Sequence, residues 1–166
     1  MQTQKIARCA LFTCAALVLS LVESFLPVAA VPVPGIKLGL ANIVILFALY
    51  RLDLPSAWVI LAAKCILSAV FGGGVTAFAF SLCGGALALL VMACLKRLDG
   101  RGLSVYGVSV AGAAAHGVGQ ILAAMLLMRT TVVIGYLPLL LAAGIVTGAL
   151  TGAIASLLFR RFPEAV

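Results

Sequence analysis

The chain has 166 residues, of which 65% are hydrophobic and only 9% are charged, and its mean hydropathy is +1.32. A soluble domain carries about 25% charged and roughly 45–50% apolar residues, so this composition excludes a water-soluble globule and a disordered or fibrous chain. The net charge is +7 and only four residues are acidic, which excludes an enzyme built on a charged cleft. A membrane-spanning helix needs about 20 apolar residues, so the length predicts about six spans in a single transmembrane domain over residues 1–166.

The N-terminal segment predicts the first transmembrane helix, at about residues 6–26. Lys5 and Arg8 precede a long apolar run, and the alternative is a signal peptide cleaved near Pro27-Val28-Ala29-Ala30. Glu23 interrupts the cleavage region and many apolar stretches follow, which favours a retained helix.

Five more apolar stretches predict helices at about residues 38–50, 56–71, 75–95, 105–128 and 134–159. The segment Pro27–Lys37 contains three prolines and a glycine, so it is not a regular helix. The helix that follows it, at about 13 residues, is too short to cross a membrane alone at 1.5 Å per residue. We therefore expect Pro27–Lys37 to dip back into the outer half of the membrane, where protein or a watery cavity must cover its backbone.

The basic residues predict the orientation of the bundle. If the N-terminus is cytoplasmic, the outer segments hold only Lys37 and Arg129. The inner segments then hold eight basic residues: Lys5, Arg8, Arg51, Lys96, Arg97, Arg101, Arg160 and Arg161. This asymmetry predicts six helices with both termini in the cytoplasm.

Several polar residues fall in segments that should be apolar. Glu23 and Lys37 lie at the outer ends of the first two helices, where they could form an ion pair that pins the loop. Alternatively, they line an outward-facing pocket beside Asn42 with the loop as a lid. Lys64 lies about eight residues into its helix, a depth at which snorkelling is difficult, which favours a functional role or a buried ion pair.

His116 and Gln120 are one helical turn apart and share a face that small residues flank. They either form hydrogen bonds between helices or line the pocket. A single His without companion ligands predicts no metal site. The five cysteines lie in apolar runs without metal-ligand spacing, so neither a disulfide nor a zinc site is expected.

Small residues recur every fourth position in the last helix, at Gly144, Gly148 and Gly152. Such a ridge lets two helices approach closely. It could serve packing inside the bundle or docking onto a partner membrane protein.

Several motifs that follow one another along nearly the whole chain resemble one family. They are Glu23, the run Pro34-Gly35-Ile36-Lys37-Leu38-Gly39-Leu40-Ala41-Asn42-Ile43, Lys64-x2-Leu67-Ser68 followed by Phe71-Gly72-Gly73, and His116-x3-Gln120. The chain resembles the Gx transporter family, which is also labelled heptaprenyl diphosphate synthase component I.

The resemblance carries two implications. The first is the all-α, six-helix fold of the S components of energy-coupling factor transporters. S components bind a small molecule from outside, and a transmembrane T protein with two ATPases docks on them. The second implication is an accessory subunit of a soluble prenyl synthase on the menaquinone side-chain pathway.

Prenyl elongation needs Asp-rich clusters that hold Mg²⁺ and a diphosphate, whereas Asp53 and Asp99 stand alone. The chain also has no P-loop for ATP hydrolysis. We therefore expect a non-enzymatic, small-molecule-binding transporter subunit of a bacterial cytoplasmic membrane, with no cofactor and no nucleic-acid partner. The alternative is the non-catalytic component I subunit, and a purely structural scaffold is a third possibility.

The expected site lies in the outer half of the bundle. Its residues are Glu23, Lys37, Asn42, Lys64, His116 and Gln120, because hydrocarbon would expel these side chains unless they faced one another or a ligand. Two lysines near one carboxylate indicate an anionic ligand. The competing interpretation is a self-satisfied polar network that binds nothing.

Overall fold

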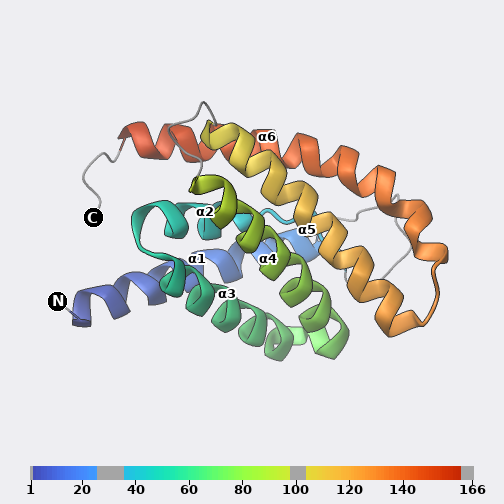
Figure 1. Cartoon of the computed structure of the whole chain (residues 1–166). Coiled ribbons are helices and arrows are strands. Elements are labelled where there is room, and N and C mark those ends of the chain that lie inside the picture. The colour runs from blue at the N-terminus through green and yellow to red at the C-terminus, as the bar shows by residue number, and fades with distance from the viewer. Residues whose placement is uncertain (1, 26–35, 98–103, 162–166) are drawn as a thin grey trace.

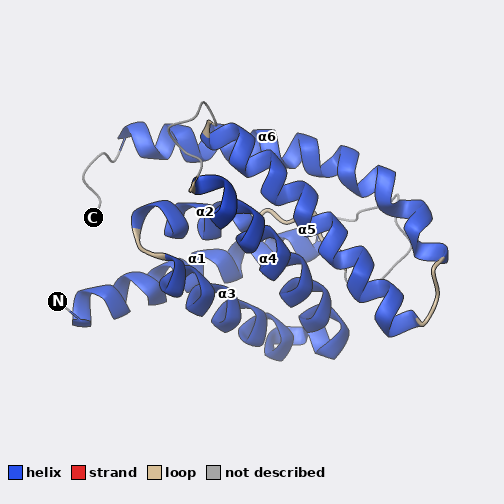
Figure 2. Ribbon diagram, in the orientation of Figure 1, coloured by secondary structure: helices blue, strands red, loops and turns tan. Residues whose placement is uncertain are grey.

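The structure, a computed structural model, describes residues 2–25, 36–97 and 104–161. Over these residues its regular secondary structure is all helix, with six α-helices (Figure 2), which confirms the predicted all-α class and helix number. The helices are α1 (Gln2–Phe25), α2 (Asn42–Arg51), α3 (Leu54–Ser68), α4 (Gly74–Lys96), α5 (Val105–Met128) and α6 (Leu137–Arg161). A π-helix (Ala69–Gly73) joins α3 to α4, and a 3-10 helix (Val132–Tyr136) precedes α6.

Five of these helices are long and apolar enough to cross a membrane, and α2 is the exception. α1 and α6 expose most of their apolar side chains, including Leu11, Leu150 and Val146. Large exposed apolar surfaces of this kind are expected where lipid, not water, surrounds the protein. The chain is a multi-pass membrane protein.

The short helix α2 lies at the centre of the bundle (Figure 1) and packs against each of the other five α-helices. Ile45, Leu46 and Leu49 are almost fully buried there, with Ile60, Leu61 and Leu89 of the neighbouring helices in the same core. Because neighbouring protein covers α2, its 10 residues need not reach both faces of the membrane.

Several contacts bring four helix termini to one end of the bundle. Lys5 near the start of α1 forms an ion pair with Asp53, in the turn between α2 and α3. Arg51 at the end of α2 donates to the Phe159 carbonyl oxygen near the end of α6, at 3.2 Å. Lys96 at the end of α4 donates to the Leu49 carbonyl oxygen, at 2.6 Å. The first turn of α1 and the last turn of α6 accordingly lie on the same side in Figure 1.

The starts of α2 and α3 differ from those that the sequence suggests for a local reason that the structure shows. α2 begins at Asn42 and not at residue 38, because Gly39 has φ +86° and interrupts the helix. α3 begins at Leu54 and not at residue 56, because the Asp53 side chain accepts from the Ser56 N–H at 2.8 Å and Pro55 suits the first turn.

The remaining boundaries differ at the connections. The predicted 56–71 helix is α only as far as Ser68 and then continues as the π-helix, while α6 starts three residues later than expected, at Leu137. α5 has the expected bounds. The re-entrant segment expected at Pro27–Lys37 lies outside the described residues except for its last two, Ile36 and Lys37, which are buried and non-helical.

Candidate functional site: a buried polar centre

All six residues expected to form the site are buried. Their side chains retain at most 9% of their accessible surface, and Gln120 retains none. We call this set the polar centre: Glu23, Lys37, Asn42, Lys64, His116 and Gln120. It draws on α1, the non-helical segment before α2, α2 itself, α3 and α5.

The carboxylate of Glu23 holds the turn that leads into α2. Its Oε1 atom accepts the backbone N–H of Gly39 and, at 3.4 Å, that of Leu40. These N–H groups have no partner inside a helix because the chain is not helical there. The α1 carboxylate thus fixes the start of the central helix.

The two lysines of the polar centre are bound by serines. Lys37 donates to the carbonyl oxygen and hydroxyl of Ser20, at 3.2 and 3.1 Å, and Lys64 donates to the Ser81 hydroxyl at 2.9 Å. Of the two alternatives open for Glu23 and Lys37, the ion pair is not formed, since no nitrogen–oxygen distance between them is within 4.0 Å. The turn N–H groups occupy the carboxylate instead, although both lysines remain within electrostatic range of it.

His116 lies between two glycines that leave room for its ring. A Cβ atom on Gly39 would come within 2.8 Å of the imidazole Cδ2, and one on Gly84 would come within 2.8 Å of Cε1 and Nδ1. Gly84 also faces Gln120, and Gly39 also faces Asn42. The two glycines thus bring the His116 ring against both the turn before α2 and helix α4.

Five polar side-chain atoms of the polar centre have no hydrogen-bond partner among the described residues. They are Asn42 Nδ2, both ring nitrogens of His116 and both polar atoms of the Gln120 carboxamide. An unpaired buried polar atom costs about 1–3 kcal/mol, so this arrangement is not a self-satisfied network within the described part of the chain. It offers both donors and acceptors to a polar molecule.

A small cavity adjoins these atoms, with a volume of about 10 Å³. It is lined by Lys37, Leu38, Ala113, His116, Gly117, Leu140, Ala143 and Gly144. This is about the space that one water molecule needs. This cavity has room for a water and not for a larger ligand unless its walls move.

The polar centre carries more positive than negative charge. Lys37 and Lys64 supply two ammonium groups against the single carboxylate of Glu23. Within the described ranges, no three His, Cys, Asp or Glu side chains are grouped so that they could hold a metal ion. The arrangement can orient an anionic or hydrogen-bonding group.

Sequence reasoning missed the residues that support the polar centre. Ser20 lies one turn before Glu23 on the same face of α1, a spacing that could have indicated a shared partner. Ser81 is one of two hydroxyl residues in the apolar helix α4 and gives no comparable signal. Gly39 and Gly84 are needed for their small size, which only the packed structure reveals.

The small-residue ridge of α6 packs against α5. A Cβ atom on Gly148 would lie 2.7 Å from the Val110 Cα atom, and one on Gly152 would lie 3.1 Å from the Tyr106 Cα atom. Gly144 similarly faces the Ala113 backbone. The described structure thus uses all three glycines for close contact inside the bundle.

The fold and the polar centre together define a small multi-pass membrane protein with a buried, cation-rich interior. The model of one family, heptaprenyl diphosphate synthase component I, matches residues 12–158. The chain belongs to the heptaprenyl diphosphate synthase component I family. No curated protein and no solved structure matches it.

Proposed function

We propose that the chain is a non-catalytic membrane subunit that works with a soluble prenyl diphosphate synthase, on the pathway to the menaquinone side chain. Membership of the component I family, over residues 12–158, is the observation that carries this proposal. The scarcity of carboxylates supports a non-catalytic role, because prenyl elongation needs acidic clusters for Mg²⁺ and the chain has two isolated aspartates.

The orientation we propose places the basic end of the bundle in the bacterial cytoplasm. Lys5, Arg51 and Lys96 meet at that end through the contacts given above, and Arg160 and Arg161 close α6 there. Positive charge on the cytoplasmic side is the general rule for membrane proteins. A soluble synthase would then meet the membrane subunit at this end.

Co-purification tests the proposal. The affinity-tagged chain, extracted in mild detergent, should retain a prenyl diphosphate synthase. Replacing the exposed Arg160 and Arg161 with Gln should weaken this retention, whereas Arg129→Gln at the other end should not. Recovery without any prenyl synthase from cells that make one would overturn the proposal.

The polar centre supports a second candidate, a small-molecule-binding subunit of a transporter of the S-component type. Its two lysines and its unpartnered His116 and Gln120 are suited to an anionic molecule that enters from outside. Because the adjoining cavity has space for about one water, such binding requires the walls to move apart. Co-purifying ATPase subunits in place of a synthase would favour this candidate.

Lysine substitutions test the second candidate directly. Lys37→Met and Lys64→Met keep a side chain of similar length but remove its charge. Native mass spectrometry of these variants should therefore show loss of a co-purifying small anion. Lys5→Met serves as the matched control, because Lys5 is exposed and far along α1 from the polar centre. Unchanged retention in folded Lys37→Met and Lys64→Met protein would remove both lysines from the site.

A further inference from the structure

A large apolar cleft separates α1 from α6. Its volume is about 790 Å³, and α2 forms its floor. The lining residues are Arg8, Leu11, Phe12, Ala15, Leu19, Leu40, Ile43, Val44, Phe47, Leu150, Thr151, Ile154 and Leu158. In the described chain α1 and α6 make no contact with each other, so this α1–α6 cleft opens sideways between them.

Only two of the lining residues are polar, and they differ in what they can still bind. The Thr151 hydroxyl is occupied, because it donates to the Thr147 carbonyl oxygen at 2.8 Å and lies 2.9 Å from the Ser109 hydroxyl. Arg8 is half-buried and has neither an ion pair nor a hydrogen bond among the described residues. Of the side chains that line the cleft in the described structure, the Arg8 guanidinium is therefore the one that is free to bind an anion.

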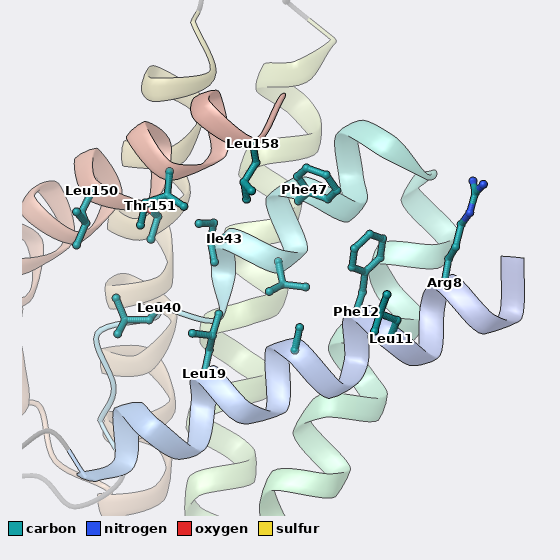
Figure 3. Close-up of a pocket in the computed structure, with 13 residues that line it drawn as sticks. Arg8, Leu11, Phe12, Leu19, Leu40, Ile43, Phe47, Leu150, Thr151 and Leu158 are labelled. Carbon is teal, nitrogen blue, oxygen red and sulfur yellow. The ribbon is translucent and has the colours of Figure 1, made fainter. Parts of the chain in front are cut away.

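Arg8 lies at one end of the cleft and the rest of the lining extends away from it. In Figure 3 Arg8 stands near the start of α1, and Leu19, Leu40 and Leu150 lie at the opposite end. Arg8 and Leu19 are eleven residues apart on α1, which corresponds to about 16 Å at 1.5 Å per residue. One cation followed by a long apolar wall complements an amphiphile with an anionic head and an extended hydrocarbon tail.

We propose that the α1–α6 cleft binds a long-chain prenyl diphosphate, with the diphosphate on Arg8 and the prenyl tail along α1, α2 and α6. A guanidinium binds phosphate oxygens through two parallel hydrogen bonds, which suits this headgroup. The proposal rests on the proposed function as a partner of a prenyl synthase. Arg8 lies at the basic end of the bundle, so a diphosphate released by a soluble synthase would meet Arg8 first.

Native mass spectrometry of the purified full chain tests the proposal with heptaprenyl diphosphate as the probe. Heptaprenol, inorganic diphosphate and phosphatidylglycerol separate the contributions of the tail, the head and an ordinary lipid. Heptaprenyl diphosphate should bind, inorganic diphosphate alone should not, and phosphatidylglycerol in equal amount should not displace the probe. If phosphatidylglycerol in equal amount displaces heptaprenyl diphosphate, the cleft is a nonspecific lipid-binding site and the proposal is overturned.

Matched variants locate the binding. Ala15→Trp fills the cleft, whereas Val18→Trp places the same bulk on an exposed part of α1 that does not line it. Ala15→Trp should lower affinity at least tenfold and Val18→Trp should not. Arg8→Gln should lower affinity for heptaprenyl diphosphate by about tenfold, the usual value of a lost charge-assisted contact, and leave heptaprenol binding unchanged.

A second cleft-filling variant and a measurement of synthase retention complete the test. If Ala15→Trp does not fold, Leu150→Trp fills the cleft from α6, where Leu150 is exposed. Wild-type affinity in a folded cleft-filling variant would overturn the proposal. Retention of the synthase is measured on the same samples. A chain that retains the synthase but does not bind the probe refutes the cleft proposal alone, and a chain that binds the probe without the synthase refutes the proposed function.

Discussion

Glu23 is a buried carboxylate whose main partners are backbone N–H groups and not a cation. In Glu23→Ala the N–H groups of Gly39 and Leu40 lose their acceptor, and Gly39 is buried. An unsatisfied buried donor costs about 1–3 kcal/mol, so we expect Glu23→Ala to lower the free energy of unfolding by about that amount. The thermal unfolding midpoint in detergent measures the effect.

Two variants serve as controls for Glu23→Ala. Glu23→Gln keeps a carbonyl oxygen that can accept the same N–H groups, so it should lie between wild type and Glu23→Ala. Val22→Ala changes the preceding position, which is exposed, and should unfold like wild type. A wild-type midpoint in Glu23→Ala would show that the carboxylate does not hold the turn before α2.

Asp53, in the turn between α2 and α3, gives the fold a dependence on pH. Its hydrogen bonds with Lys5 and with the N–H of Ser56 lower the pKa of the Asp53 carboxyl from 3.8 to about 2. A carboxyl whose pKa is lower in the folded protein stabilises the fold above its unfolded pKa, and this contribution is lost as the pH falls towards about 2. The side chain is 43% exposed, so the effect is small.

The variant Asp53→Asn isolates this contribution, because Asn caps a helix about as well as Asp but carries no charge. Wild type should unfold at a higher temperature than Asp53→Asn at neutral pH. The difference should shrink as the pH falls from about 4 to about 2. A difference that stays constant over this range would contradict the assigned role of the ionised carboxyl.

At the scale of the residue, the sequence predicts which side chains are unusual but not their partners. Lys64, His116 and Gln120 are polar in apolar helices, and this alone predicts that they avoid lipid. Each serine that binds Lys37 or Lys64 lies 17 residues away, on a helix that does not contain that lysine, a spacing that no single-helix pattern relates to its lysine. Glu23 and Lys37 look like an ion pair because their charges are opposite and their helices adjacent. The sequence does not reveal that N–H groups of the turn before α2 bind the Glu23 carboxylate, and this binding takes the place of the ion pair.

At the scale of the element, the contact between α5 and α6 depends on glycine. Gly148→Ala would place its Cβ 2.7 Å from the Cα atom of Val110, and a backbone atom cannot give way as a flexible side chain can. Overpacking of this kind costs about 1–3 kcal/mol. We therefore expect Gly148→Ala to lower the unfolding midpoint, although Ala favours helix by up to about 1 kcal/mol over Gly.

Gly135→Ala is the matched control for Gly148→Ala. A Cβ atom on Gly135 would meet no described atom within 4 Å, so the same substitution there should leave the midpoint unchanged or slightly raised. Equal loss of stability in the two variants would indicate a general effect of glycine and not close packing of α5 on α6.

Some features of the helices follow from the local sequence, and others depend on the packing of the whole bundle. Long apolar runs predict α1, α4 and α5 because lipid requires every backbone group to be bonded within the helix. Asp53 and Pro55 carry a recognisable helix start that places α3 two residues earlier than apolar character alone suggests. The central position of α2 is a property of the whole bundle, and the sequence shows only that this helix is short.

At the scale of the whole molecule, the contacts between helix termini and the positions of the basic residues define the same axis, from a basic end to the opposite end of the bundle. Three contacts tie the basic helix termini together at one end of the bundle: Lys5 with Asp53, Arg51 with Phe159 and Lys96 with Leu49. The 3-10 helix before α6 lies at the other end, beyond the last residue of α5. The cation of the α1–α6 cleft belongs to the basic end. The lysines of the polar centre lie deeper in the bundle, so the cleft and the polar centre are separate places.

Cysteine accessibility tests the orientation of this axis. In a chain whose native cysteines are replaced by Ser, Arg97→Cys marks the basic end and Thr131→Cys the opposite end, both at exposed positions on either side of α5. If the basic end faces the cytoplasm, a membrane-impermeant thiol reagent should label Thr131→Cys in intact cells. Arg97→Cys should react only after the membrane is opened. Labelling of Arg97→Cys in intact cells would reverse the orientation, and with it the side from which a soluble synthase could reach Arg8.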